Sequence, residues 1–283
     1  GSPQMTESVP VEAIDCDRTA RSMTERILRG AGNPAILAYR CTPMISCDAM
    51  VHGISRSGKL VVAACPGGDD PLWQMECGER FSVRMDITKE SPEVQFRLVA
   101  ATVHLLGELE WQPDWITDEL IAAGELPDTV SAIAGAPNGR LGVVEAERCL
   151  IHDSAGVHCF GFDELLTATA ERAFPAAEDE FDAHHVVMAL SDDSLRGIRD
   201  AVLNGSIGGR LCARKSALGG CPHTWNQVLC ADVDRTGITM LTVEPTETYS
   251  VFAAFEHEVS TLDDLCREVE GLVDSAPMRL PHI

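Results

Sequence analysis

The spacing of apolar residues changes near residue 162, and this change limits the folds open to the chain. Up to that point the apolar residues form short runs separated by Gly, Pro, Asp and Ser, a pattern typical of β-strands. The runs cover residues 35–39, 48–54, 59–64, 81–87, 94–99 and 102–109, and a hairpin over 141–152 and 157–160 follows. After residue 163 the apolar residues recur at helical spacing. The first part of the chain is therefore predicted to be rich in strands, and the second to mix helices and strands.

Helices are expected at only a few places in the first part. The spacing indicates one helix over 17–30 and two short helices within 114–136. The second part ends with predicted strands at 227–232, 237–243 and 250–255 and a helix at 261–274. We therefore expect an α+β fold, with a β-barrel domain at 15–162 and a smaller α+β domain at 163–283 whose antiparallel sheet is covered by helices.

Charge and cysteine content narrow the class of function. The 283 residues include 44 Asp and Glu against 22 Lys and Arg, giving a net charge of −22. This charge repels a phosphate backbone, so no nucleic-acid partner is expected. We also expect no membrane span, because no apolar stretch reaches the roughly 18 residues that one requires. With no visible signal peptide and no Cys-x-x-Cys pair among eleven cysteines, a cytoplasmic protein with reduced thiols is expected.

Three stretches resemble a known superfamily. They are DDPLWQ at 69–74, FSVRMDITKESPEVQFRLVAATVHLLGELE at 81–110 and LGVVEAERCLIHDSAGVHCFGFDELL at 141–166. Their order is similar to that of the flavin- and haem-binding split barrels, and the C-terminal part resembles the α+β domain attached to such barrels. HugZ-type haem-utilisation proteins and the glutamyl-tRNA-reductase-binding protein share this pairing. The resemblance implies an N-terminal split β-barrel, a homodimer, and haem or FMN as ligand.

The resemblance favours haem over flavin. Flavin-binding members show an Arg-x-x-Leu-Val run with Ser or Thr donors for the phosphate, and residues 97–102 (RLVAAT) match it only in part. The run that usually opens the C-terminal domain is replaced by FDAHHVVM at 181–188. We therefore take haem as the predicted ligand and FMN as the alternative.

Haem requires an axial ligand, commonly His or Cys, and cations for its propionates. The resemblance implies that His282 in the C-terminal tail ligates the iron, although a frayed tail explains the same residue. His104 is a second candidate, on a predicted strand, and the alternative for it is a histidine with a structural role. Cys221 precedes Pro222, as in short haem-regulatory motifs with a thiolate ligand. These three residues are the candidate ligands.

Basic residues are informative in so acidic a chain. A glycine-rich insert at 205–220 contains three basic residues within six positions, Arg210, Arg214 and Lys215. The insert is either an anion-binding flap or a solvated loop. Arg84 and Arg97 lie on predicted strands and are further candidates for the ligand's carboxylates. Period 2 places Asp86 on the same face as Arg84, so an internal ion pair explains that arginine without a ligand.

The sequence thus predicts a cytoplasmic haem-binding protein that acts in haem sequestration, trafficking or oxidative degradation for iron release. If it is an enzyme, the resemblance implies an oxygenase-type oxidoreductase that degrades haem. Two alternatives stay open: a flavin-dependent oxidoreductase on the same barrel, and a non-catalytic regulatory or interaction module.

Overall fold

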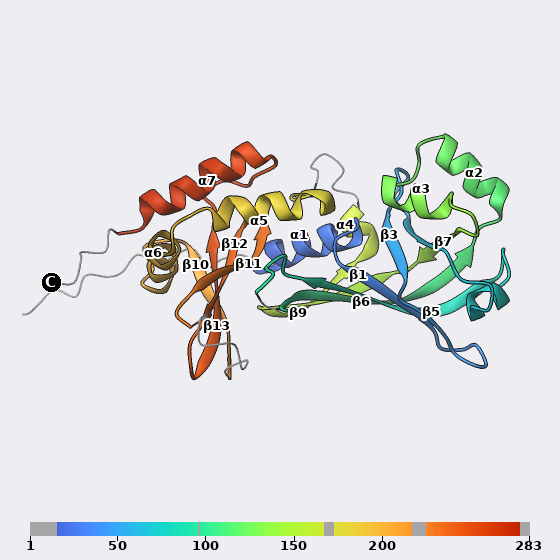
Figure 1. Cartoon of the computed structure of the whole chain (residues 1–283), viewed down its shortest axis with the longest axis horizontal. Helices are drawn as coiled ribbons and strands as arrows, with labels where there is room; N and C mark the ends of the chain where they lie inside the picture. Colours follow the sequence, from blue (N-terminus) through green and yellow to red (C-terminus); the bar gives the residue numbers. More distant parts are fainter. Residues whose placement is uncertain (1–15, 96, 167–172, 217–224, 278–283) are drawn as a thin grey trace, which may run out of the picture.

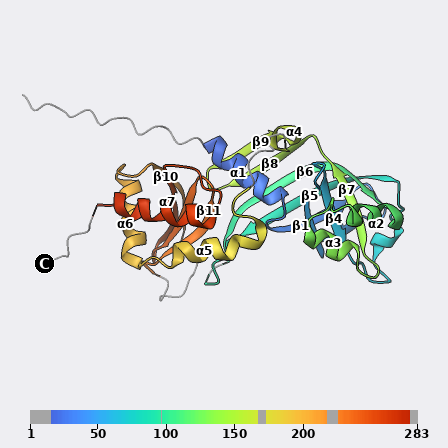
Figure 2. The same ribbon diagram turned by 90° about the horizontal axis from the view of Figure 1, so that it is seen from above.

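The computed structural model describes residues 16–95, 97–166, 173–216 and 225–277. Figure 1 shows two antiparallel sheets side by side along the longest axis of the molecule, and Figure 2 shows the same arrangement from above. Each sheet packs against its own helices and its own hydrophobic core. The mixed α/β class with antiparallel sheets agrees with the expected α+β fold. The exact division at residue 162 stays a prediction.

Nine strands form the first sheet. They are β1 (Asn33–Ala38), β2 (Ile45–Cys47), β3 (Met50–Ile54), β4 (Leu60–Ala64), β5 (Arg80–Glu90), β6 (Val99–Trp111), β7 (Arg140–Glu145), β8 (Arg148–Asp153) and β9 (Gly156–Gly161). The order of paired strands is β2-β1-β5-β6-β7-β4-β3, and β8 joins β6 to β9. Because this path does not return on itself, the sheet is not a closed barrel, and the split barrel stays a prediction.

The long strand β6 changes its partner halfway along. Its second half pairs with β7 from Glu108 to Trp111, whereas Thr102 to Leu105 pair with β8. Gly107 lies at the change, where a Cβ atom would stand 2.4 Å from the carbonyl oxygen of Glu145. Only glycine allows the two backbones to approach so closely. The strands β7 and β8 therefore pair with β6 one after the other, and residues 146 and 147 connect them.

The helices of the first part cover the core and the rim of the sheet. They are α1 (Cys16–Leu28), α2 (Asp114–Ala122), α3 (Asp128–Ala134), α4 (Phe162–Leu166) and the 3-10 turn η1 (Pro71–Gln74). Ile27 and Leu28 of α1 are fully buried in the same core as Met85, Leu109 and Trp111. The Nε2–H of His52 on β3 donates to the Ile27 carbonyl at 2.6 Å and fixes the end of α1.

Four strands and three helices form the second sheet and its cover. They are the strands β10 (Gly209–Ser216), β11 (Val228–Asp234), β12 (Gly237–Val243) and β13 (Glu247–Ala254), with α5 (Glu180–Met188), α6 (Asp192–Leu203), α7 (Leu262–Ser275) and the 3-10 turn η2 (Ala177–Asp179). The order is β10-β13-β12-β11. Apolar residues of the helices pack on one face of this sheet. The side chain of Thr261 accepts from the Asp264 N–H and caps the start of α7.

Two local predictions differ from the structure. Residues 94, 95, 97 and 98 belong to the connection between β5 and β6 rather than to the predicted strand, although Ser91 N–H donates to the Leu98 carbonyl at 2.7 Å. The glycine-rich insert contains the strand β10, which pairs along β13. Gly209 suits this strand pairing because it has no Cβ atom. A Cβ at this position would lie only 2.2 Å from the Phe252 carbonyl oxygen. Gly209 in the insert is therefore explained by the close packing of β10 against β13.

Buried ion pairs join the two parts. Arg26 on α1 is fully buried, and its guanidinium donates to Asp232 at 2.9 Å, Asp234 at 3.0 Å and Glu180 at 2.8 Å. Lys89 on β5 reaches Asp232 at 2.9 Å. Burial alone would raise the pKa of Asp232, but the charges of Arg26 and Lys89 lower it to about 2. The pairs hold α1 and β5 of the first part against β11 of the second.

No helix within the described ranges is long and apolar enough to cross a membrane.

Candidate functional site

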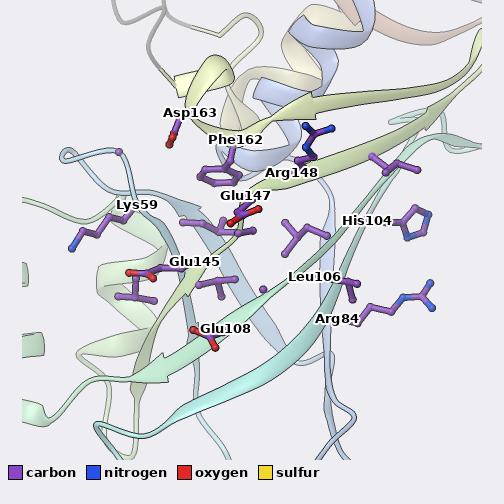
Figure 3. A pocket seen from close by; sticks show the side chains of 18 of the residues that line it. Lys59, Arg84, His104, Leu106, Glu108, Glu145, Glu147, Arg148, Phe162 and Asp163 are labelled. Carbon is purple, nitrogen blue, oxygen red and sulfur yellow. The ribbon is translucent and has the colours of Figure 1, made fainter.

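A groove of about 1060 Å³ opens on the outer face of the first sheet, where β7 and β8 separate (Figure 3). We call it the outer-face groove; its lining includes Lys59, Arg84, His104, Leu106, Arg148 and Leu150. Small-molecule and cofactor sites usually have volumes of about 300–1,000 Å³, so the groove can hold a large ligand. Figure 3 shows Lys59 and Asp163 at one end and His104 and Arg84 at the other.

Asp86 organises the second of these ends. Its Oδ1 accepts from the Nδ1–H of His104 at 2.5 Å and from the Nε–H of Arg84 at 3.2 Å. The register places all three residues on one face, since Asp86 lies opposite His104 and Arg84 opposite Leu106. A carboxylate that accepts from Nδ1–H leaves Nε2 of the neutral ring with its lone pair. His104, with a third of its side chain exposed, can therefore offer Nε2 to a metal or a proton.

A second histidine lies beside His104. The ring of His152 on β8 meets the His104 ring edge to face, with 5.3 Å between the centroids. Both rings belong to the outer face because Thr102 is the partner of His152 and Leu150 the partner of His104. Since the two imidazoles stand on the same face, they cannot ligate one haem iron from opposite sides.

Basic and acidic side chains surround the groove. Lys59 and Arg148 are exposed and form no ion pair with any residue in the described ranges. Arg80 neutralises part of the acidic charge, since it pairs with Glu108 at 3.4 Å and Glu145 at 3.2 Å. Glu147 and Asp163 also line the groove. Lys59 and Arg148 are therefore the cations best placed to meet carboxylates of a ligand.

Exposed apolar residues form the middle of the groove. Leu106 is 65% exposed although it lies in the centre of the long strand β6, and Leu150 beside it is 39% exposed. A large apolar side chain in the middle of a strand is usually covered, and contiguous exposed apolar surface marks binding sites. Phe162 at the start of α4 lines the groove too, but it is only 7% exposed and belongs to the hydrophobic core of the first part. The middle of the groove can thus accept an apolar surface.

The structure brings together two of the predicted site residues, His104 and Arg84. Arg97 lies outside the groove lining, pairs with Glu90 at 3.6 Å and is 90% exposed. Arg210 lies in a different cavity, with its guanidinium 5.9 Å from the Phe252 ring centre. Four further candidates are placed only in part or not at all. Arg214 and Lys215 belong to β10 with side chains outside the description, and Cys221 and His282 lie outside the described residues altogether.

Sequence reasoning missed Arg148 and His152 as site residues. A usable signal existed, because Arg148, Leu150 and His152 alternate along the predicted hairpin and must share one face. What the sequence does not indicate is that this face is open to solvent. Within the described ranges, no three His, Cys, Asp or Glu side chains gather as a metal site.

Comparison with known proteins gives likeness of structure only. No family model and no curated protein matches the chain. A haem binding protein from Mycobacterium smegmatis matches with a TM-score of 0.47 and 19% identity, over 93% of this chain and 98% of that one. A protein of unknown function from Agrobacterium tumefaciens matches with a TM-score of 0.33 and 14% identity, over 94% and 98%. With likeness this distant, ligand and activity have to be argued from the chain's own residues.

Proposed function

We propose that the protein binds haem in the outer-face groove. The observation that carries the proposal is the hydrogen bond between Asp86 and His104, which orients the His104 ring at one end of the groove. A metal-ligating histidine commonly donates its other N–H to a carboxylate, which fixes the ring and raises its basicity. His104 is therefore the proposed ligand of the haem iron, in place of the predicted His282.

Other residues of the groove match the remaining parts of the haem molecule. Leu106 and Leu150 offer exposed apolar surface for the porphyrin face, and Lys59 and Arg148 offer charges for its propionates. Bound haem supplies iron-centred redox chemistry, while the protein binds and orients it. We propose sequestration, trafficking or degradation of haem, with haem as cargo or substrate.

We further propose that the protein is a cytoplasmic homodimer with two domains in each chain. Residues 15–162 form a split-barrel domain, and residues 163–283 form the second domain. The separate hydrophobic cores support the two domains. A second copy that closes over the haem-filled groove would cover the parts of Leu106 and Leu150 that the porphyrin leaves exposed. The Leu106→Glu variant is then expected to sediment as a monomer, and a monomeric wild type would contradict the dimer.

Titration with haemin tests the binding. Wild-type protein is expected to shift and sharpen the Soret band with saturation at one haem per chain, and His104→Ala to weaken binding at least about tenfold. Arg148→Gln should weaken it by less, whereas Glu147→Gln should strengthen it because a repelling charge is removed. The absence of saturable binding, or full affinity in His104→Ala, would overturn the proposed site. Addition of ascorbate then separates degradation, in which the Soret band decays, from binding alone.

A further inference from the structure

A second cavity, of about 520 Å³, lies between the two sheets. We call it the inter-sheet cavity. One wall is the face of the second sheet opposite its helices, and the other consists of residues 98–102, the turn at 153–156 and two residues of α1. Its volume is in the range of sites for small organic molecules. His152 lines both this cavity and the outer-face groove, but the charged residues that line each of them differ.

The inter-sheet cavity carries a net negative charge. Three carboxylates and one basic side chain belong to its described lining, namely Asp153, Asp232, Asp234 and Arg210. Arg26 and Lys89 reach Asp232 from outside the lining, but both of them also pair with Glu180, so they do not neutralise every carboxylate. The guanidinium of Arg210 lies over the Phe252 ring and has a further interaction within the protein. The cavity therefore favours a cation over an anion.

Asp153 is the lining carboxylate with the fewest partners. Its side chain is only 7% exposed, and its Oδ1 accepts from the Ala155 N–H at 2.8 Å within the turn. Nε2 of His158 lies 3.9 Å from the same oxygen. Within the described ranges, Oδ2 forms no hydrogen bond and no Lys or Arg pairs with this carboxylate. Because a buried carboxylate is normally paired with a cation, a positively charged ligand would supply the missing partner.

Two hydroxyl groups of β13 provide independent evidence for a ligand. Thr248 is only 3% exposed, and its Oγ1 forms no hydrogen bond with any residue that the structure describes. Ser250 is also buried and forms no side-chain hydrogen bond in the same part of the chain. Both residues line the cavity, because alternate positions of a strand share one face. A buried hydroxyl normally has a partner, and its oxygen can accept from an N–H group.

The turn that carries Asp153 meets this face of β13. The next residue, Ser154, forms a hydrogen bond with the thiol of Cys212 on β10. The residue that follows Cys212 pairs with Ser250 across the ladder, so Asp153 and Ser250 belong to the same region of the cavity. Leu241 pairs with Ser250 from the other side and adds apolar surface to the lining. A carboxylate, hydroxyl groups and an apolar wall thus occur together.

We infer that the inter-sheet cavity is a second ligand site, for a small organic amine in its cationic form. The ammonium group lies against Oδ2 of Asp153 and the hydroxyl of Ser250, and the apolar body packs on Leu241. Thr248 accepts from a further N–H or O–H group of the ligand. Binding at this site goes beyond the proposed function and requires no haem in the outer-face groove.

Three probes of similar shape and different charge test the inference on the full-length protein without haem. They are benzylamine, benzyl alcohol and benzoate, and isothermal titration calorimetry at pH 7 measures their binding. Wild type is expected to bind benzylamine saturably and at least about tenfold more tightly than benzyl alcohol, because only the ammonium group can pair with Asp153. Benzoate is expected not to bind, since its charge is repelled.

Two variants locate the bound amine. Asp153→Asn should remove the preference for benzylamine over benzyl alcohol, and the asparagine oxygen can still accept from the Ala155 N–H and keep the turn. Ser250→Ala should weaken benzylamine binding about three- to tenfold. The matched control is Glu147→Gln, which removes a carboxylate of the outer-face groove and should bind benzylamine like wild type.

Circular dichroism and thermal unfolding establish that each variant is folded. If Asp153→Asn does not fold, the three probes on wild type and the Ser250→Ala variant still decide. The inference would be overturned by equal affinity for benzylamine and benzyl alcohol, or by no saturation of wild type up to about 10 mM. A preference for benzylamine that persists in Asp153→Asn, or that is lost in Glu147→Gln, would also overturn it.

Discussion

A single carboxylate, Asp86, determines what the outer-face groove can do. It accepts hydrogen bonds from His104 and Arg84 at the same oxygen atom. Both donors lie on strands, which hold their backbones fixed, so the carboxylate controls the direction of the imidazole. The sequence predicts the proximity of Arg84 and Asp86, which are two residues apart on one strand. It does not predict that His104, on the neighbouring strand, is the third member.

Replacement of the Asp86 carboxylate tests how much the orientation of the His104 ring contributes to haem affinity, because His104 itself stays in place. Asp86→Asn removes the charge that fixes the His104 ring, so haem affinity is expected to fall about 10–100-fold, as for other residues behind a metal ligand. Haemin titration followed at the Soret band measures the change. Ser82→Ala, on the same face of β5, is the matched control and should bind haem like wild type. Unchanged affinity in Asp86→Asn would show that the carboxylate does not support the ligand.

At the scale of elements, apolar periodicity predicts strands and helices well where one face is buried. The predicted helix at 17–30 corresponds to α1, and the strand at 237–243 to β12 with the same bounds. Periodicity is less informative for β10, whose glycines and cations look like a loop. Backbone pairing with β13 decides its conformation, and such pairing leaves little trace in local composition.

Two adjacent glycines allow a direct test of β10. A Cβ at Gly209 would collide with the Phe252 carbonyl oxygen, whereas a Cβ at Gly208 meets nothing within 4 Å. Gly209→Ala is therefore expected to lower the free energy of unfolding by about 1–3 kcal/mol, and Gly208→Ala to change it by less than about 0.5 kcal/mol. Urea unfolding measures both. Similar values for the two variants would mean that β10 is not packed as described.

At the scale of the whole molecule, buried charges hold the two parts together. Removal of one partner from such a group is costly because the other charge stays buried. Arg26 is separated from Asp232 by 206 residues, and both are buried. The sequence does not pair them, since each looks like an ordinary surface residue of an acidic chain. Their pairing follows only from the packing of α1 against β11.

These pairs make stability depend on acid pH. The pKa of Asp232 is about 2 in the folded protein against an ordinary 3.8, so the unfolded state binds more protons between these values. Its contribution of about 2 kcal/mol is complete above pH 4 and is lost as the pH falls toward 2. Asp234, whose burial raises its pKa, acts in the opposite direction.

The difference between wild type and Asp232→Asn isolates this contribution. Urea unfolding at several pH values should show that the two free energies of unfolding converge by about 2 kcal/mol between pH 5 and pH 2. Asp263→Asn, at the exposed start of α7, is the control and should not reproduce that convergence, because Asp263 forms no ion pair with any residue in the described ranges. A constant difference between wild type and Asp232→Asn would contradict the assigned ion pairs.

The sequence by itself determined most of the segments that form strands and helices, the change from a strand-rich to a mixed part, and the ion pair of Arg84 with Asp86. These follow from periods of 2 and 3.6 residues, which act over short distances along the chain. Only the tertiary structure decided where β6 changes its partner, that His104 and His152 meet, and that Arg26 crosses to the second sheet. Such contacts join residues tens to hundreds of positions apart, and local periodicity carries no record of them.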